Sequence, residues 1–205
     1  MLNRMTTANK HPFEKVVSWI GHVADAIAIL IDHNLAHQDI RMPNIIVDDH
    51  DHTVAKVIDF NIMVKYNQTN HILVLKDYVI DAETMEDITL SPYYPPFYYK
   101  DPNNFVKYLE NFTVYSNVKP GELLQLYLHV HGLTKDGLLS KAKHCTLDLS
   151  HVDGYSLGII MLECYLMMKV QLNSKDANLY LSVARGLTDL NSPLHPREVR
   201  KLLQS

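Results

Sequence analysis

The segment from Asp153 to Met168 constrains the fold most, because apolar side chains lie on nearly every side of the helix that it predicts. The residues that show this are Leu157, Ile159, Ile160, Met161, Leu162, Cys164 and Leu166. A helix without a polar face has to be surrounded by other elements of a folded domain. Glu163 interrupts the run, and the apolar stretch is shorter than the roughly 20 residues that cross a bilayer. The segment therefore predicts a buried central helix in a mainly α domain.

The bulk properties of the chain fit one cytoplasmic domain. A chain of 205 residues can bury a sizeable core, and its net charge of −4 provides no basic excess for a nucleic-acid surface. Cys145 and Cys164 form no spaced pair, which disfavours a disulfide framework or a cysteine zinc site. The polar N-terminus also lacks the apolar run of a secretory signal. We expect neither a nucleic-acid nor a membrane partner.

Three further segments carry helical patterns. Residues 12–34 begin with Pro12, which suits a first helical turn, and place apolar side chains on one stripe, at Val16, Ile20, Val23, Ile27 and Leu30. Residues 175–187 and 196–203 predict two more helices near the C-terminus. Residues 103–148 predict a helical insertion, and residues 1–11 an N-terminal tail.

The candidate functional residues follow the first helix. The loop His37-Gln38-Asp39-Ile40-Arg41-Met42-Pro43-Asn44 leads into a predicted β-hairpin, whose second strand spans 53–60 and contains Asp59. Asp39, Asn44 and Asp59 supply the oxygen atoms that can orient a hydroxyl nucleophile and hold Mg²⁺. The hairpin therefore predicts a site for phosphoryl transfer.

Simpler interpretations exist for each acidic residue. Asp39 and Asp59 can be an ordinary loop residue and a strand-end residue, and Asp153 can be an acid favoured by the dipole at a helix N-terminus. The acidic, histidine-containing turn at 48–52 could bind a metal, but it lacks the glycine of a calcium-binding loop, and a solvated turn is the simpler interpretation.

The pattern His37-x-Asp39-x-x-x-x-Asn44, followed by a hairpin and Asp59-Phe60, resembles the catalytic and metal-binding loops of eukaryotic-type serine/threonine protein kinases. Two later segments agree in type and order. Pro95-Pro96-Phe97 stands where the family has Ala-Pro-Glu at the end of the activation segment. The segment 153–158, Asp-Gly-Tyr-Ser-Leu-Gly, resembles the start of the central helix of the large lobe.

This resemblance implies a fold and a chemistry. The fold is a protein-kinase-like large lobe over residues 12–205, mainly α (α+β), in which a helical bundle carries a short catalytic-loop hairpin. Asp39 would orient the substrate hydroxyl, Arg41 would lie near the transferred phosphate, and Asn44 and Asp59 would bind Mg²⁺ and thereby ATP.

The resemblance also implies supporting roles. Asp153 would hold the backbone of the catalytic loop from the central helix. His37 and Phe60 would pack beneath the loop rather than take part in chemistry.

Several departures from the family affect regulation and structure. Gln38 replaces the arginine that usually meets a phosphorylated activation loop, so activation by phosphate is not expected. Asn61 replaces the glycine after Asp-Phe, and asparagine tolerates left-handed backbone. Phe97 replaces the glutamate that pairs with a C-terminal arginine, which leaves Arg197 as that arginine without its partner.

The small lobe is also missing from the pattern. The 36 residues before His37 contain no Gly-x-Gly-x-x-Gly loop and no recognisable strand lysine. Three functions are therefore open. The first is a serine/threonine kinase that acts on a protein substrate with a small lobe that is supplied in trans or was lost from the gene model. The second is a non-catalytic pseudokinase-like module that binds a protein partner, and the third is a small-molecule phosphotransferase of the aminoglycoside or choline kinase type.

Overall fold

The structure is a computed structural model. It describes residues 2–10, 12–48, 54–66, 93–99, 101–112, 118–145, 148–168 and 174–204. Most of the polar turn that could have bound a metal lies outside these ranges, and so do Ser91 and Pro92.

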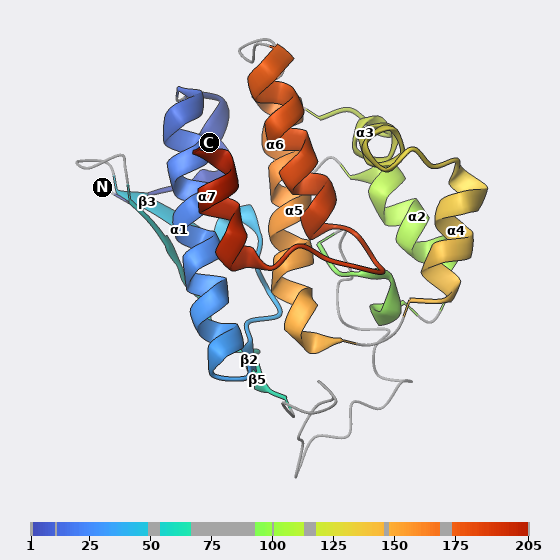
Figure 1. Cartoon of the computed structure of the whole chain (residues 1–205), viewed down its shortest axis with the longest axis horizontal. Coiled ribbons are helices and arrows are strands. Elements are labelled where there is room, and N and C mark those ends of the chain that lie inside the picture. Colours follow the sequence, from blue (N-terminus) through green and yellow to red (C-terminus); the bar gives the residue numbers. More distant parts are fainter. Residues whose placement is uncertain are drawn as a thin grey trace.

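The predicted central helix is confirmed as α5, Leu149–Met168. All but four of its residues are buried, and it packs against α1 (Phe13–Asp32), α3 (Glu122–His131) and α6 (Ser174–Leu187). Figure 1 shows α1, α5 and α6 running side by side through the middle of the molecule. The described part of the chain is mostly helical, as the sequence predicts.

A glycine allows the close approach of α5 to the end of α6. A Cβ atom on Gly158 would lie 2.6 Å from Thr188 Cγ2 and 3.2 Å from the carbonyl oxygen of Ala184. Real Cβ atoms do not approach other atoms to 2.6 Å, so any larger residue would push the two helices apart.

The segment predicted as a helical insertion forms α2 (Pro102–Asn111), α3 and α4 (Lys135–Lys143). These helices lie together on one side of α5 (Figure 1). Their buried side chains belong to the same apolar cluster as those of α5; among them are Phe105, Leu109, Leu123, Tyr127 and Leu138. The segment is thus part of the main core.

Most of the segment expected as an N-terminal tail, residues 1–11, forms secondary structure. Residues Leu2–Arg4 form strand β1, which pairs antiparallel with β3 (Ile45–Asp48), and Met5–Lys10 form the 3₁₀ helix η1. The side chains of Met5 and Ala8 are fully buried. Strand β1 forms because it pairs with the distant strand β3. A short polar sequence does not indicate such a partner.

Two small antiparallel pairings position the loop between α1 and the hairpin. Strand β3 pairs with β4 (Ala55–Val57) in the register Ile46 to Lys56, and β2 (Leu35–Ala36) pairs with β5 (Val64–Lys65). The Ile58 amide donates to the carbonyl oxygen of Asn44 at 2.9 Å. The residues before and after the hairpin are therefore held next to each other.

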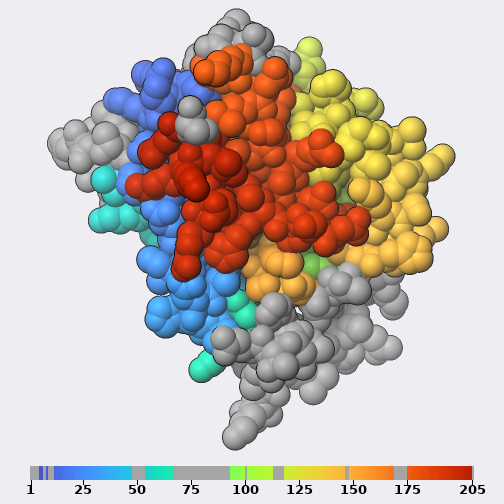
Figure 2. All heavy atoms as spheres, in the orientation of Figure 1, coloured from blue at the N-terminus to red at the C-terminus, as the bar shows by residue number. Residues whose placement is uncertain are grey.

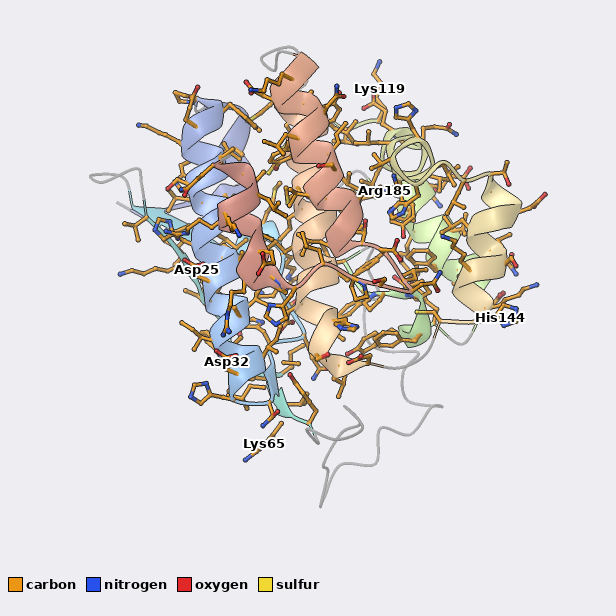
Figure 3. The ribbon with its side chains drawn as sticks, viewed as in Figure 1. Asp25, Asp32, Lys65, Lys119, His144 and Arg185 are labelled. Carbon is orange, nitrogen blue, oxygen red and sulfur yellow. The ribbon has the colours of Figure 1, made fainter. Side chains whose placement is uncertain are left out.

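The C-terminal segment packs across α1. It consists of the 3₁₀ helix η5 (Pro196–Glu198) and helix α7 (Val199–Leu203). Both contact α1, and Figure 2 shows this end of the chain (dark red) beside α1 (blue). Arg200 pairs with Asp25 at 2.6 Å, and Arg197 pairs with Asp32. Both acids lie on α1, beside this segment (Figure 3).

Arg197 has a different partner from the one that the kinase family provides. Phe97 leaves it without the glutamate of the family, and Arg197 instead contacts Asp32 at the end of α1. Such a contact depends on the tertiary packing of η5 against α1, which the local sequence does not specify. Among the described residues, no helix is both long and apolar enough to span a membrane.

Candidate functional site

The loop after α1 is anchored by one buried carboxylate on α5. Asp153 is 2% exposed, and its two oxygens accept the backbone amides of His37 at 2.6 Å and Gln38 at 2.9 Å. These are the contacts that the resemblance implies for Asp153. The acid does not lie in the first turn of α5, so the helix-dipole interpretation does not account for it.

The backbone is strained at two positions of this site. Gln38 has φ +65° and Asp59 has φ +67°; Asn34, at the end of α1, is the other described residue besides glycine with a positive φ. Residues other than glycine enter this region at a cost, and asparagine and aspartate do so most readily. The two hydrogen bonds from the backbone amides of His37 and Gln38 to Asp153 hold Gln38 in this conformation. Such strain clusters at functional sites.

Asp39, Arg41 and Asn44 form a connected group. The Asn44 amide nitrogen donates to Asp39 Oδ2 at 2.6 Å and to the Asp39 carbonyl oxygen at 3.0 Å. Arg41 Nε lies 3.0 Å from Asp39 Oδ1 as an ion pair, although its N–H is not aligned for a hydrogen bond. Because both Asp39 atoms are acceptors, they fix which end of the Asn44 amide is nitrogen, and Asn44 Oδ1 is the end available to a cation.

The His37 ring supports the loop from below, as the resemblance implies. The ring is fully buried; its Nε2 contacts the Ile58 carbonyl oxygen at 3.1 Å, and its Nδ1 accepts the Asp39 amide at 3.2 Å. These partners specify the tautomer with hydrogen on Nε2. The ring also packs edge-on against Phe60, at 4.7 Å between centroids. Phe60 is only partly packed, however, since 46% of it is exposed.

Burial sets the electrostatics of these groups. It raises the pKa of Asp39, an effect that Arg41 and Asn44 partly oppose, and it lowers the pKa of His37. Burial also raises the pKa of Asp153 to about 6. The two hydrogen bonds from backbone amides oppose this shift, because they favour the charged form. Because its pKa is lowered from 6.5, the His37 imidazole is neutral at neutral pH.

Three side chains have roles that the sequence did not reveal. Gln38 Oε1 accepts the Tyr98 hydroxyl at 2.7 Å, and Gln38 Nε2 donates to the Ile62 carbonyl oxygen at 3.0 Å. Tyr93, at the start of the same segment as Tyr98, donates its hydroxyl to the buried Glu163 of α5 at 2.5 Å. No local pattern in the sequence indicated these partners.

The donor atoms suit a hard cation. Asn44 Oδ1 and the Asp59 carboxylate are oxygen ligands, as Mg²⁺ requires, and the Ile58–Asn44 backbone bond brings their segments together. Among the described residues, no group of three or more His, Cys, Asp or Glu side chains is arranged around a metal site. A site at Asn44 and Asp59 would therefore use few protein ligands, which is usual for Mg²⁺ held together with phosphate.

No protein-family model matches this chain, and no curated protein matches it. The geometry of the loop is the basis on which a function can be inferred.

Proposed function

We propose that this chain is the large lobe of a protein-kinase-type phosphotransferase, which uses Mg²⁺ and ATP to phosphorylate a serine or threonine hydroxyl of a protein. The observation that supports this most is the anchoring of the loop, in which buried Asp153 accepts the amides of His37 and Gln38. A desolvated carboxylate and a left-handed glutamine both destabilise the fold. Because both features cost stability, we infer that the exact position of Asp39 matters for function.

Asp39 is the residue assigned to the acceptor hydroxyl. Each carboxylate oxygen has two lone pairs, so the contacts with Asn44 and Arg41 leave each oxygen able to accept a further hydrogen bond. The raised pKa of Asp39 makes it a better proton acceptor than an ordinary aspartate. Arg41 has 38% of its side chain exposed and carries positive charge next to the place where a phosphate would be transferred.

Asn44 and Asp59 are the residues assigned to Mg²⁺. The hydrogen bonds of Asn44 direct its nitrogen to Asp39 and reserve its oxygen for the cation. When bound, Mg²⁺ neutralises charge on the phosphates of ATP. Asp59 carries its carboxylate on a left-handed backbone position that the turn after the hairpin imposes.

The nucleotide also needs a second surface, which we assign to a kinase small lobe. Phe60, Ile62 and Met63 follow Asp59 directly, and they are 46%, 49% and 37% exposed. Neighbouring exposed apolar side chains mark an interaction surface more often than an ordinary one. A partner lobe on this surface would enclose ATP from the side that this chain leaves open.

A kinase-like binding module without catalysis is the second candidate. One observation favours it: both oxygens of Asp39 are already engaged within the loop, by Asn44 and Arg41. In this account Asp39 stabilises the loop, and the surface around it binds a protein partner.

Phosphate transfer distinguishes the two candidates. The chain is incubated with radiolabelled ATP and Mg²⁺, with and without a protein kinase small lobe, and with protein, choline and aminoglycoside acceptors. We expect Mg²⁺-dependent labelling of protein that Asp39→Asn abolishes and that Asp136→Asn, a matched change on the exposed side of α4, leaves intact. Absence of transfer under all these conditions favours the binding module, and labelling of the small acceptors alone indicates a small-molecule phosphotransferase.

A further inference from the structure

A pair of hydrogen bonds through Gln38 joins three segments of the site. The Tyr98 hydroxyl donates to Gln38 Oε1 at 2.7 Å, while Gln38 Nε2 donates to the Ile62 carbonyl oxygen at 3.0 Å. Gln38 is 8% exposed, so these bonds are largely shielded from water. We call this arrangement the Gln38 bridge.

Two of the three segments that the Gln38 bridge joins are attached to helix α5. The Gln38 backbone is bonded to Asp153 on α5. The segment containing Tyr98 is also bonded to α5, because the Tyr93 carbonyl oxygen accepts the Ser156 hydroxyl at 2.8 Å. The rings of Tyr94 and Phe97 pack against Tyr98, at 5.1 Å and 4.9 Å between centroids.

The third end of the bridge is the turn that carries Asp59. Ile62 lies in this turn, whose Met63 amide donates to the Phe60 carbonyl oxygen at 3.2 Å. Side chains around the turn are exposed, so few packing contacts hold it. The bond from Gln38 Nε2 to Ile62 is therefore a main constraint on the position of the turn.

The Gln38 bridge is uncharged. Glutamine does not titrate, and burial raises the pKa of Tyr98 far above neutrality, so its hydroxyl stays a donor. The amide uses its oxygen for Tyr98 and its nitrogen for Ile62. Exchanging the two ends would place the amide oxygen against the Ile62 carbonyl oxygen, acceptor against acceptor. The bridge therefore has one orientation and needs no phosphate group to form.

We propose that Gln38 is a positioning residue that couples the Asp59 turn to the segment 93–99, so that a change at either end alters the other. The coupling itself follows from the bridge. In the proposed function, this coupling would adjust the position of the Mg²⁺ ligand Asp59 when an acceptor binds along 93–99. This role rests on the proposed function.

Hydrogen exchange of the Met63 amide, measured without Mg²⁺ or nucleotide, tests the coupling. Gln38→Met keeps the size of the side chain and removes both bonds, and Tyr98→Phe removes only the distant one. We expect about tenfold faster exchange at Met63 in Gln38→Met, as for the loss of one buried hydrogen bond of ordinary strength. Tyr98→Phe should also accelerate it, and the double variant should add nothing to Gln38→Met.

Two controls separate coupling from general loosening. Tyr94→Phe removes a hydroxyl from the ring beside Tyr98 and should leave exchange at Met63 unchanged. Amides in the middle of α5 should keep their protection in every variant. If Tyr98→Phe has no effect at Met63, Gln38 holds only its own turn and the coupling is refuted, and the same holds if Gln38→Met leaves the exchange rate at its wild-type value.

A charged variant adds a test of orientation. In Gln38→Glu the ionised carboxylate cannot donate to Ile62, whereas the protonated carboxyl has one donor and one acceptor, as glutamine does. Exchange at Met63, corrected for its intrinsic pH dependence, should be fast at high pH and slow again as the carboxyl is protonated. Asp153, Asp39 and His37 titrate nearby, so the variant is compared with wild type and Gln38→Met at each pH. Fast exchange at every pH would contradict the assigned orientation.

The outcome is independent of catalysis. A chain that binds neither Mg²⁺ nor ATP can still show the coupling. That result would support the Gln38 bridge and refute the proposed function. Conversely, Mg²⁺-dependent transfer without coupling at Met63 would retain the function and remove the role of Gln38.

Discussion

Replacing Asp153 with asparagine should change how stability depends on pH, because this carboxyl is buried against two amides. Burial raises its pKa from the ordinary 3.8 to about 6, so the folded chain binds this proton more tightly than the unfolded chain does. Its contribution to stability is therefore fully present below about pH 4 and is lost as the pH rises through 6. The pKa difference corresponds to about 3 kcal/mol.

Asparagine does not titrate, so it removes this pH dependence. It also presents an N–H group to one of the two loop amides, which costs about 1–3 kcal/mol at every pH. The free energy of unfolding of wild type minus that of Asp153→Asn should thus fall by up to about 3 kcal/mol between pH 4 and pH 7. Other titrating groups are common to both chains and largely cancel in the difference.

Urea denaturation at several pH values measures this difference. Trp19 is the single tryptophan, and it is fully buried on α1, so its fluorescence reports global unfolding. Asp136→Asn, an exposed site, is the matched control for the loss of one carboxyl group. A difference that is constant from pH 4 to pH 7, or that rises with pH, would refute the burial account of Asp153.

Three other substitutions test the packing. Met5→Ala should lower the free energy of unfolding by about 2–5 kcal/mol in urea denaturation, because its fully buried side chain would leave a cavity. Gly158→Ala should cost about 1–3 kcal/mol in the same measurement, because the new methyl group would overlap Thr188. Arg197→Ala should change stability by less than about 1 kcal/mol, since its pair with Asp32 is exposed, and a double-mutant cycle measures the pair directly.

Each of these substitutions has a clear opposite result. An unchanged free energy of unfolding in Met5→Ala would indicate that the N-terminus is only a loosely attached tail. Gly21→Ala is the control for Gly158→Ala, because its nearest neighbour is the movable side chain of Arg200. Equal effects at the two glycines would contradict the close helix contact. A cost well above 1 kcal/mol in Arg197→Ala would show that η5 depends on this pair.

The helices were predictable where the apolar pattern is strong. The run 153–168 has no polar face, so its burial follows from composition alone, and α1 follows from a single stripe starting at Val16. The anchoring of the loop by Asp153 was also predictable, although only through a resemblance that links distant motifs. The two helices depend on residues whose spacing is local.

Features that depend on distant partners were not predictable. Strand β1 exists because β3 offers an edge to it, and the polar sequence of residues 2–10 contains no sign of that edge. The Gln38 bridge needs the carbonyl oxygen of Ile62 and the hydroxyl of Tyr98, which only the folded chain brings together. The resemblance placed Gln38 where the kinase family has an arginine, but it did not indicate what this side chain contacts.

Binding of a divalent cation at Asn44 and Asp59 is the central claim, and paramagnetic Mn²⁺ tests it most directly. Titration of the labelled chain, followed by NMR, should broaden the amide signals of Asp39, Asn44 and Asp59 first, and an excess of Mg²⁺ should reverse the effect. Asn44→Ala and Asp59→Asn should each remove the selective broadening. Uniform broadening, or broadening centred on the acidic turn at 48–52 that persists in both variants, would contradict the account.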